Sequence, residues 1–155
     1  MLQRRAFLRA TLASSAIILA VSAGLLTPKR VLGSWNKAAF NATGLQTALK
    51  SALGSDLTEA TTLVTIQAPD IAENGAVVPL AVSSQLKNSA QITLFATQNR
   101  TPLIAQFELD KNTQAYISTR IKIAKSSNII AIVSADGKLY STRKQIKVNI
   151  GGCQG

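Results

Sequence analysis

The sequence predicts an all-β fold: an immunoglobulin-like antiparallel β-sandwich of about seven strands with a short N-terminal helix. The first observation is a series of short runs, beginning after Leu57, that are rich in β-branched and aromatic residues. The second is that turn-forming residues separate these runs, with no helical segments between them to support parallel pairing. The third is size, because 155 residues with 46% hydrophobic content suffice for one domain with its own core.

One amphipathic helix is expected ahead of the strands. Four apolar residues recur at helical spacing, and we expect Thr43 to cap the N-terminus of the helix and Gly54 to end it. The apolar residues are Leu45, Ala48, Leu49 and Ala52.

The predicted strands are separated by turn signals. Asp136 and Gly137 have the pattern of a tight two-residue hairpin, and residues 73–75 (Glu-Asn-Gly) are also typical of a turn. We place Pro79 at a strand edge or a bulge, because proline cannot donate a hydrogen bond to a ladder. The strands are predicted at residues 61–68, 76–83, 91–97, 103–109, 115–123, 128–134 and 138–148.

The composition excludes several classes of chemistry. The chain has no histidine and a single cysteine. It therefore cannot form an intramolecular disulfide, a cysteine and histidine metal cluster, or a catalytic site that needs its own imidazole. We expect no cofactor and no bound metal in this chain.

Residues 1–33 are predicted to be a twin-arginine-type signal peptide, which would export the protein to the periplasm. Residues 3–9 are basic and contain Arg4 and Arg5, and residues 16–26 are apolar. Residues 31–34 (Val-Leu-Gly-Ser) offer small residues for a cleavage after Gly33. The alternative is an uncleaved membrane anchor, since residues 10–28 carry no charge; Ser, Thr and Gly interrupt that stretch and favour the leader. We expect no stable membrane association once the leader is removed.

The leader also explains much of the excess positive charge. The whole chain has 17 basic and 7 acidic residues, and five of the basic ones lie in residues 1–33. The remaining basic residues are scattered, with few aromatic residues among them, so neither a phosphate-binding surface nor a base-stacking surface is visible. Nucleic acid is therefore not an expected partner.

The single cysteine, Cys153, lies two residues from the end of the chain. Gly151 and Gly152 precede it and Gly155 follows it, and glycine adopts many backbone conformations and cannot pack a core. We therefore divide the exported chain into a sandwich domain at residues 34–149, with the helix at its start, and a flexible C-terminal arm at residues 150–155. Extended residues span about 3.3 to 3.6 Å each, so residues 150 to 153 project the sulfur roughly 10 to 14 Å beyond the last strand.

Charged residues near this arm have two interpretations. Arg143, Lys144 and Lys147 could attract an anionic sulfur species, but alternating strand geometry makes ordinary solvated lysines at a sheet edge the simpler explanation. Asp70 and Glu73 could form a carboxylate pair, but they lie in a turn and not in a cleft that would shift their acidity. Neither group is predicted to be catalytic.

The segment at residues 71–79 (IAENGAVVP), the terminal GGCQG and the twin-arginine leader together resemble the SoxY family, the sulfur-carrier subunits of the periplasmic thiosulfate-oxidising Sox system. The resemblance implies that Cys153 carries thiosulfate-derived sulfur covalently and presents it to other proteins, so the chain itself is not an enzyme. It further implies a heterodimer with a second small β-sandwich subunit, SoxZ. Transient contacts with the Sox cytochrome, hydrolase and sulfur dehydrogenase enzymes are also implied.

One position departs from the family pattern, and two other functions stay open. Family tails typically read Gly-Gly-Cys-Gly-Gly, whereas Gln154 follows the cysteine here, which puts its fit to the usual partners in doubt. The first alternative is a non-catalytic envelope adaptor whose cysteine is incidental. The second is a protein whose Cys153 forms an intermolecular disulfide.

Overall fold

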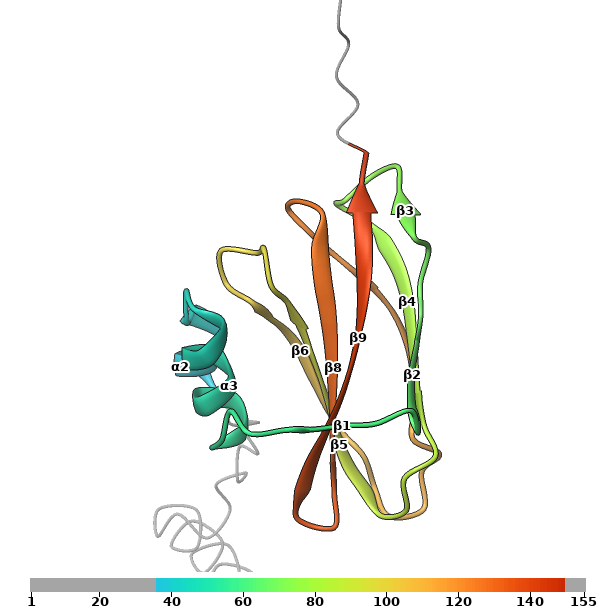
Figure 1. Cartoon of the computed structure of the whole chain (residues 1–155). Coiled ribbons are helices and arrows are strands. Elements are labelled where there is room, and N and C mark those ends of the chain that lie inside the picture. The colour runs from blue at the N-terminus through green and yellow to red at the C-terminus, as the bar shows by residue number, and fades with distance from the viewer. Residues whose placement is uncertain (1–35, 150–155) are drawn as a thin grey trace, which may run out of the picture. The chain divides into compact units, whose positions relative to one another are not determined.

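The computed structural model describes residues 36–149, so the predicted leader and the predicted arm lie outside the described residues. Two helices are followed by strands that build two facing sheets (Figure 1). The elements are α2 (Lys37–Asn41), α3 (Leu45–Leu53), β1 (Glu59–Ala60), β2 (Val64–Gln67), β3 (Ile71–Ala72), β4 (Val78–Ser84), β5 (Ser89–Ala96), β6 (Leu103–Glu108), β7 (Tyr116–Ile121), β8 (Ser127–Ala135) and β9 (Lys138–Val148).

The seven longer strands, which correspond to the seven predicted ones, form the β-sandwich. The larger sheet has the order β1-β9-β8-β5-β6, and the smaller sheet has the order β2-β4-β7. β2, β4 and β7, which are the first, second and fifth of the seven, form the smaller sheet. β5, β8 and β9, which are the third, sixth and seventh, lie in the larger sheet. This division of the strands is immunoglobulin-like. The fourth, β6, joins the larger sheet, and all pairings among the seven are antiparallel. The predicted fold class is confirmed.

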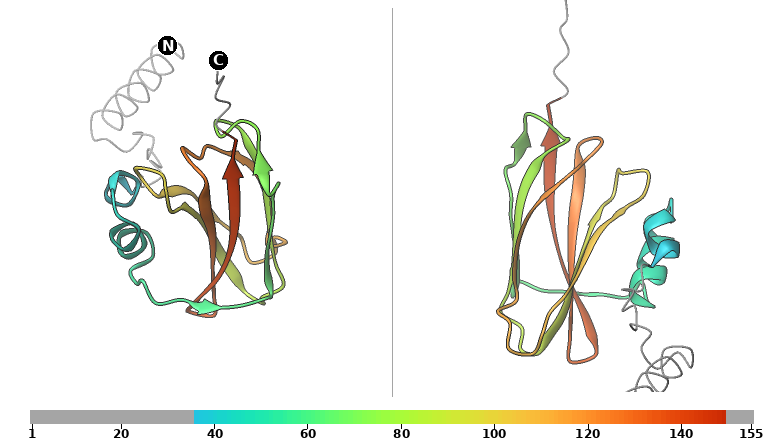
Figure 2. Two further views of the ribbon diagram at one scale, coloured as in Figure 1. Left: turned by 45° about the horizontal axis from the view of Figure 1, so that its top comes forward. Right: turned by 180° about the vertical axis from the view of Figure 1, so that it is seen from behind.

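Two short strands depart from the antiparallel prediction. β1 and β3 each pair with β9 in the parallel direction, β1 near its start and β3 near its end. Both belong to the connection that leaves α3, passes β9, enters the smaller sheet as β2 and returns to β9 (Figures 1 and 2). A two-residue strand has no period that a sequence pattern could reveal.

The main core lies between the two sheets. Residues that alternate along β2 and β4, such as Val64, Ile66, Leu80 and Val82, point inward, as expected for strands with one face toward solvent. They pack against Ile92, Leu94, Ile129, Ala131, Val133 and Ile146 of the larger sheet.

The larger sheet is also covered on its outer face. α2 and α3 pack there, where Ala39, Ala48 and Leu49 meet a second set of buried residues from the sheet (Figure 2). That set is Phe95, Leu103 and Ile132. β5 and β8 are therefore buried on both faces, which explains the nearly continuous apolar runs of their sequences. Among residues 36–149, no helix is long and apolar enough to span a bilayer.

The helix ends correct one prediction and confirm another. The N-cap of α3 is Gly44, which makes no side-chain capping bond, and so the prediction of Thr43 as the cap was wrong by one residue. Gly54 ends the helix as predicted, in the left-handed conformation at φ 75°. α2 was not predicted; it is capped by Asn36, whose side chain accepts a hydrogen bond from the amide of Ala39 at 3.1 Å.

The Asp136–Gly137 turn prediction is confirmed by the backbone, whereas the prediction of Pro79 at a strand edge or a bulge holds only locally. Asp136 and Gly137 join β8 to β9 with φ values of 50° and 74°, as a tight hairpin requires. Pro79 lies in β4, the central strand of the smaller sheet, but the pairing of β2 with β4 stops at Ala81. Pro79 is therefore paired with β7 alone, in accord with its inability to donate to a second ladder.

Candidate functional site

The residues predicted to carry the chemistry, Cys153 with Gly151, Gly152 and Gly155, lie outside the described residues. The structure does describe the strand that leads to them. Asn149 is the last described residue, and it follows directly from the end of β9. The geometry that bears on the arm is therefore the way in which the end of β9 is held.

Three consecutive amides at the end of β9 are hydrogen-bonded to two other parts of the chain. The N–H of Lys147 donates to the carbonyl of Asp70, and the N–H of Asn149 donates to the carbonyl of Ala72, both at 2.9 Å. Between them, the N–H of Val148 donates to Oγ of Ser126 at 3.0 Å. The backbone is thus fixed up to the residue from which the predicted arm begins. We call residues 70–75, together with Ile123 and Ser126, the tail anchor.

Gly75 lets the tail anchor close tightly around β9. Its carbonyl accepts a hydrogen bond from the amide of Ile123 at 2.8 Å, and it is buried. A Cβ at this position would lie 2.4 Å from the carbonyl oxygen of Ile123 and 3.2 Å from a methyl group of Val148. Only glycine fits there without displacing backbone. Asn74 shapes the turn, because its side-chain oxygen accepts from the amide of Ala76 at 2.8 Å.

The tail anchor gives a structural role to a segment that sequence reasoning treated as a loop and a turn. Residues 73–75 do form the predicted turn region, but the contacts with β9 were missed because they join segments far apart in the chain. Ser126 was missed for the same reason. The available signal was Gly75, since a glycine beside a strand can mark a close approach of two backbones.

The three basic residues before the predicted arm do not converge on one point. Lys144 shares the inward side of β9 with Ile146, whereas Arg143 and Lys147 lie on the opposite side. Nζ of Lys144 lies 2.9 Å from the carboxylate of Asp70, so its charge is already compensated. Arg143 and Lys147 are exposed. The arrangement matches solvated residues near a sheet edge rather than a preformed anion site.

The two carboxylates of the same region have no catalytic geometry. The side chain of Asp70 is 87% exposed and is bonded to Lys144. Glu73 is also exposed. Neither carboxylate lies in the buried environment that general acid or base catalysis by such a pair needs.

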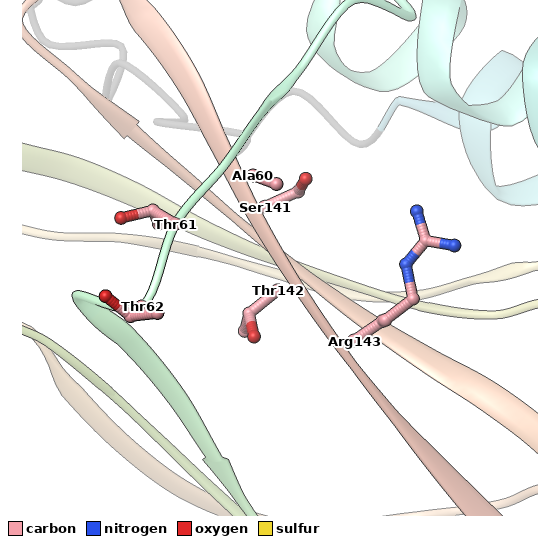
Figure 3. A pocket seen from close by; sticks show the side chains of 6 residues that line it. All are labelled: Ala60, Thr61, Thr62, Ser141, Thr142 and Arg143. Atoms are coloured by element: carbon pink, nitrogen blue, oxygen red, sulfur yellow. The ribbon is translucent and has the colours of Figure 1, made fainter.

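A shallow depression of about 490 Å³ lies between β1 and β9. Figure 3 shows the hydroxyls of Thr61, Thr62 and Thr142 on one side of β9, with Arg143 extending away on the other side. Ala60 and Ser141 complete the lining. Hydroxyl groups and one solvated guanidinium offer hydrogen bonds but no activated nucleophile. Within residues 36–149, no group of three or more candidate metal-binding side chains occurs either.

Comparisons with known proteins agree with this geometry. The family model of the sulfur oxidation protein SoxY matches residues 49–153, which span the sandwich from within α3 and end at the cysteine. Among solved structures, the chain is similar to the sulfur carrier protein SoxY from Chlorobium limicola f. thiosulfatophilum, with 36% sequence identity and a TM-score of 0.63. That match covers 74% of this chain and 100% of the other. No curated protein matches the chain.

Proposed function

Since this chain belongs to the SoxY family of sulfur oxidation proteins, we propose that it acts as a sulfur carrier by holding thiosulfate-derived sulfur covalently on Cys153. Family membership supports participation in the Sox system. We propose that the chain acts there as a carrier and does not itself turn over substrate. The partner enzymes perform the chemistry, and the carrier presents its loaded sulfur to each of them in turn.

The observation that carries this proposal is the position of the cysteine relative to the tail anchor. Cys153 follows Asn149, the last described residue and one whose amide is hydrogen-bonded, by four positions, and two glycines lie between them. A fixed backbone followed by a short glycine-containing segment suits a thiol that must enter the active sites of several enzymes. The sandwich behind it serves as the handle.

The loading reaction needs an oxidant from outside the carrier. The thiol of Cys153 loses its proton to water, and the thiolate joins the outer sulfur of thiosulfate through a new S–S bond. That step releases two electrons, which we assign to the Sox cytochrome as acceptor. The hydrolase would then cleave the bond to the terminal sulfonate with water, which releases sulfate and leaves a persulfide on Cys153. The sulfur dehydrogenase would oxidise the outer sulfur of that persulfide to a second sulfonate, with water as the oxygen source and an external acceptor for the electrons. A second hydrolysis would regenerate the thiolate of Cys153 for another cycle.

The partners and the compartment follow the same proposal. We propose a heterodimer with a SoxZ-like β-sandwich subunit and a periplasmic location reached by the twin-arginine pathway. That pathway exports folded proteins, which suits the joint export of an assembled pair. Copurification of a second small protein with the exported chain from its host is the expected result.

The decisive experiment combines mass spectrometry with one substitution. The exported protein is incubated with thiosulfate and host extract, and we expect the intact mass to rise by one S2O3 unit, with the modification located at Cys153. Cys153→Ser is expected to abolish the adduct and thiosulfate-dependent growth while the circular dichroism spectrum stays unchanged. An adduct located elsewhere, or normal growth of the variant, contradicts the proposal.

The two alternatives predict different results, one from the Cys153→Ser variant and the other from the unmodified protein. If the protein is an adaptor, Cys153→Ser is silent in growth. If Cys153 forms an intermolecular disulfide, non-reducing gels show a dimer that dithiothreitol abolishes, and no thiosulfate adduct forms. Loss of growth together with a mapped adduct distinguishes the carrier from both.

A further inference from the structure

The end of the sandwich at which β9 finishes must lie close to any protein that receives the sulfur. Cys153 is four residues beyond Asn149, and four extended residues reach at most roughly 14 Å. An enzyme that takes the thiol into a pocket therefore brings the rim of that pocket to the surface around Asn149. The charged and apolar side chains of this surface must therefore be compatible with binding such an enzyme.

Three loops surround that point. The loop at residues 122–126 lies there because β7 ends where β4 begins, at the pair of Ile121 with Val78, and β8 begins opposite the end of β9, at the pair of Ser127 with Ile146. The loop at residues 97–102 is joined to it through Asn99, whose side chain donates to the carbonyl of Lys122 at 2.9 Å and accepts from the amide of Ala124 at 2.8 Å. The turn of the tail anchor completes the ring (Figure 1).

Positive charge dominates this end of the molecule. Arg100, Lys122, Lys125 and Lys147 are exposed, and the ion pairs of the described residues involve other lysines. The charges of Lys144 and Asp70 compensate one another. Glu73 is the remaining carboxylate of the surrounding turn. Four cations therefore face one uncompensated anion.

The opposite end of the sandwich has a different balance. Its loops and strand ends carry three lysines and four carboxylates. Lys138 forms an ion pair with Glu59 at 3.5 Å, and the side-chain amide of Asn88 donates to the carboxylate of Asp136 at 2.8 Å. The lysines are Lys87, Lys111 and Lys138, and the carboxylates are Glu59, Glu108, Asp110 and Asp136. The molecule is thus polarised along its strands, with the positive end where the arm begins.

Two exposed apolar side chains lie within the positive ring. Ile71 is 61% exposed and pairs with Lys147 across the β3–β9 ladder, and Val77, at the turn before β4, is 55% exposed. Apolar groups surrounded by charged ones are the usual arrangement of a transient protein interface. We define the tail face as Ile71, Val77, Arg100, Lys122, Lys125 and Lys147.

We propose that the tail face is the docking surface for the sulfur-processing enzymes, and that these enzymes present an acidic rim around the opening through which Cys153 enters. The inference rests on the proposed carrier function. Opposite charges would raise the association rate and orient the carrier with its arm toward the opening. The apolar side chains would then make the close contact. A carrier that visits several enzymes must also leave each of them quickly. Fast association suits it, because binding can then be efficient without slow dissociation.

The test compares two double variants with the same change in net charge. Lys122→Glu/Lys125→Glu reverses charge on the tail face, and Lys87→Glu/Lys111→Glu does so at the opposite end; all four side chains are exposed. Thiosulfate-dependent cytochrome reduction is measured in an extract of a host strain that lacks its own copy of the carrier, at limiting carrier concentration. We expect the tail-face variant to lose about tenfold or more of its rate at low salt, and the matched control to lose less than about twofold. Added salt should reduce the wild-type rate and narrow the difference.

The outcomes separate this inference from the proposed function. If Cys153→Ser retains activity in the same assay, the carrier function itself fails. If Cys153→Ser is inactive and the two double variants behave alike, only the docking inference is overturned. If the tail-face variant loses its copurifying subunit, the surface belongs to the stable heterodimer, which also overturns the inference.

A second pair of variants tests the apolar part of the tail face. Ile71→Ser is expected to reduce the rate about fivefold or more at all salt concentrations, since loss of a contact at the centre of an interface is not screened by ions. Leu57, which is 81% exposed and lies outside the tail face, provides the control. Leu57→Ser should leave the rate unchanged. Equal rates for both variants contradict a contact role for Ile71.

Discussion

Gly75 lies in the tail anchor, where the turn at residues 73–75 packs against Ile123 and the end of β9. Its neighbours leave no room for a side chain, because a Cβ would lie 2.4 Å from the carbonyl oxygen of Ile123. That oxygen belongs to the backbone and cannot rotate away as a flexible side chain would. The tail anchor therefore requires glycine at position 75, because even the methyl group of alanine would collide with the backbone.

We predict that Gly75→Ala destabilises the protein by about 1 to 3 kcal/mol, the usual range for an added group in a filled site. Urea unfolding monitored by circular dichroism measures the change. Ala76→Ser is the control, because Ala76 is the exposed neighbour in the same turn and its replacement should change the free energy of unfolding by less than about 0.5 kcal/mol. Equal unfolding midpoints for the two variants would show that the turn adjusts to the methyl group.

At the level of the elements, α3 begins without the hydrogen bond that usually stabilises a helix start. Gly44 occupies the N-cap with φ −116° and ψ 143°, which any residue can adopt, and it supplies no side-chain acceptor. The first turn of α3 also contains no acidic residue. A carboxylate at position 44 would address both features, and a Cβ there meets Oγ1 of Thr47 at an ordinary 3.6 Å.

Gly44→Asp is therefore expected to raise the free energy of unfolding by about 0.5 to 1 kcal/mol, through the added cap, the favourable charge at the helix N-terminus and the less flexible unfolded chain. Thermal unfolding monitored by circular dichroism provides the measurement. Thr43→Ala should have almost no effect, because Thr43 is not the cap. A loss of about 1 kcal/mol in that variant would restore Thr43 as the capping residue.

The elements also show what sequence patterns can predict. Seven strands and α3 were predictable, since each is long enough to display alternation or a helical period. β1, β3 and α2 were not, because elements of two or five residues are too short for a strand or helix period to recur twice. The parallel direction of β1 and β3 follows from the path of the connection past β9, which no local pattern records.

The candidate site likewise has parts that could be predicted from the sequence and parts that could not. Cys153 and its glycines were recognisable because a lone thiol among glycines is unusual, and the family match extends to that cysteine. Their structure lies outside the described residues. The tail anchor was not predictable, because the bonds from Ser126 and residues 70–72 to β9 arise only when the two sheets face each other. The non-converging directions of Lys144 and Lys147, by contrast, follow directly from strand alternation.

At the scale of the whole molecule, the contacts between the helices and the larger sheet lie in a different region from the proposed docking surface. The helices cover the outer face of the larger sheet (Figure 2), and the tail face surrounds the end of β9. β8 and β9 connect the two regions, since Ile132 packs under the helices while Ile146 belongs to the core beneath the end of β9. A change under the helices should therefore affect stability without affecting the proposed docking surface.

Ala48→Asp tests this separation. Ala48 is fully buried between α3 and the sheet, so an aspartate there would place an unpaired charge in an apolar contact, and we expect a loss of about 3 kcal/mol or more in the free energy of unfolding. The melting temperature should fall, and a dye that binds exposed apolar surface should bind near Phe95 and Ile132. Gln46→Asp, at an exposed position of the same helix, should leave the melting temperature nearly unchanged.

Below its melting temperature, Ala48→Asp should still acquire the thiosulfate adduct at the wild-type rate, because the tail anchor and the tail face do not include the helices. A loading rate that falls together with stability would mean that the helices help to present Cys153, and that the division between the two regions is wrong.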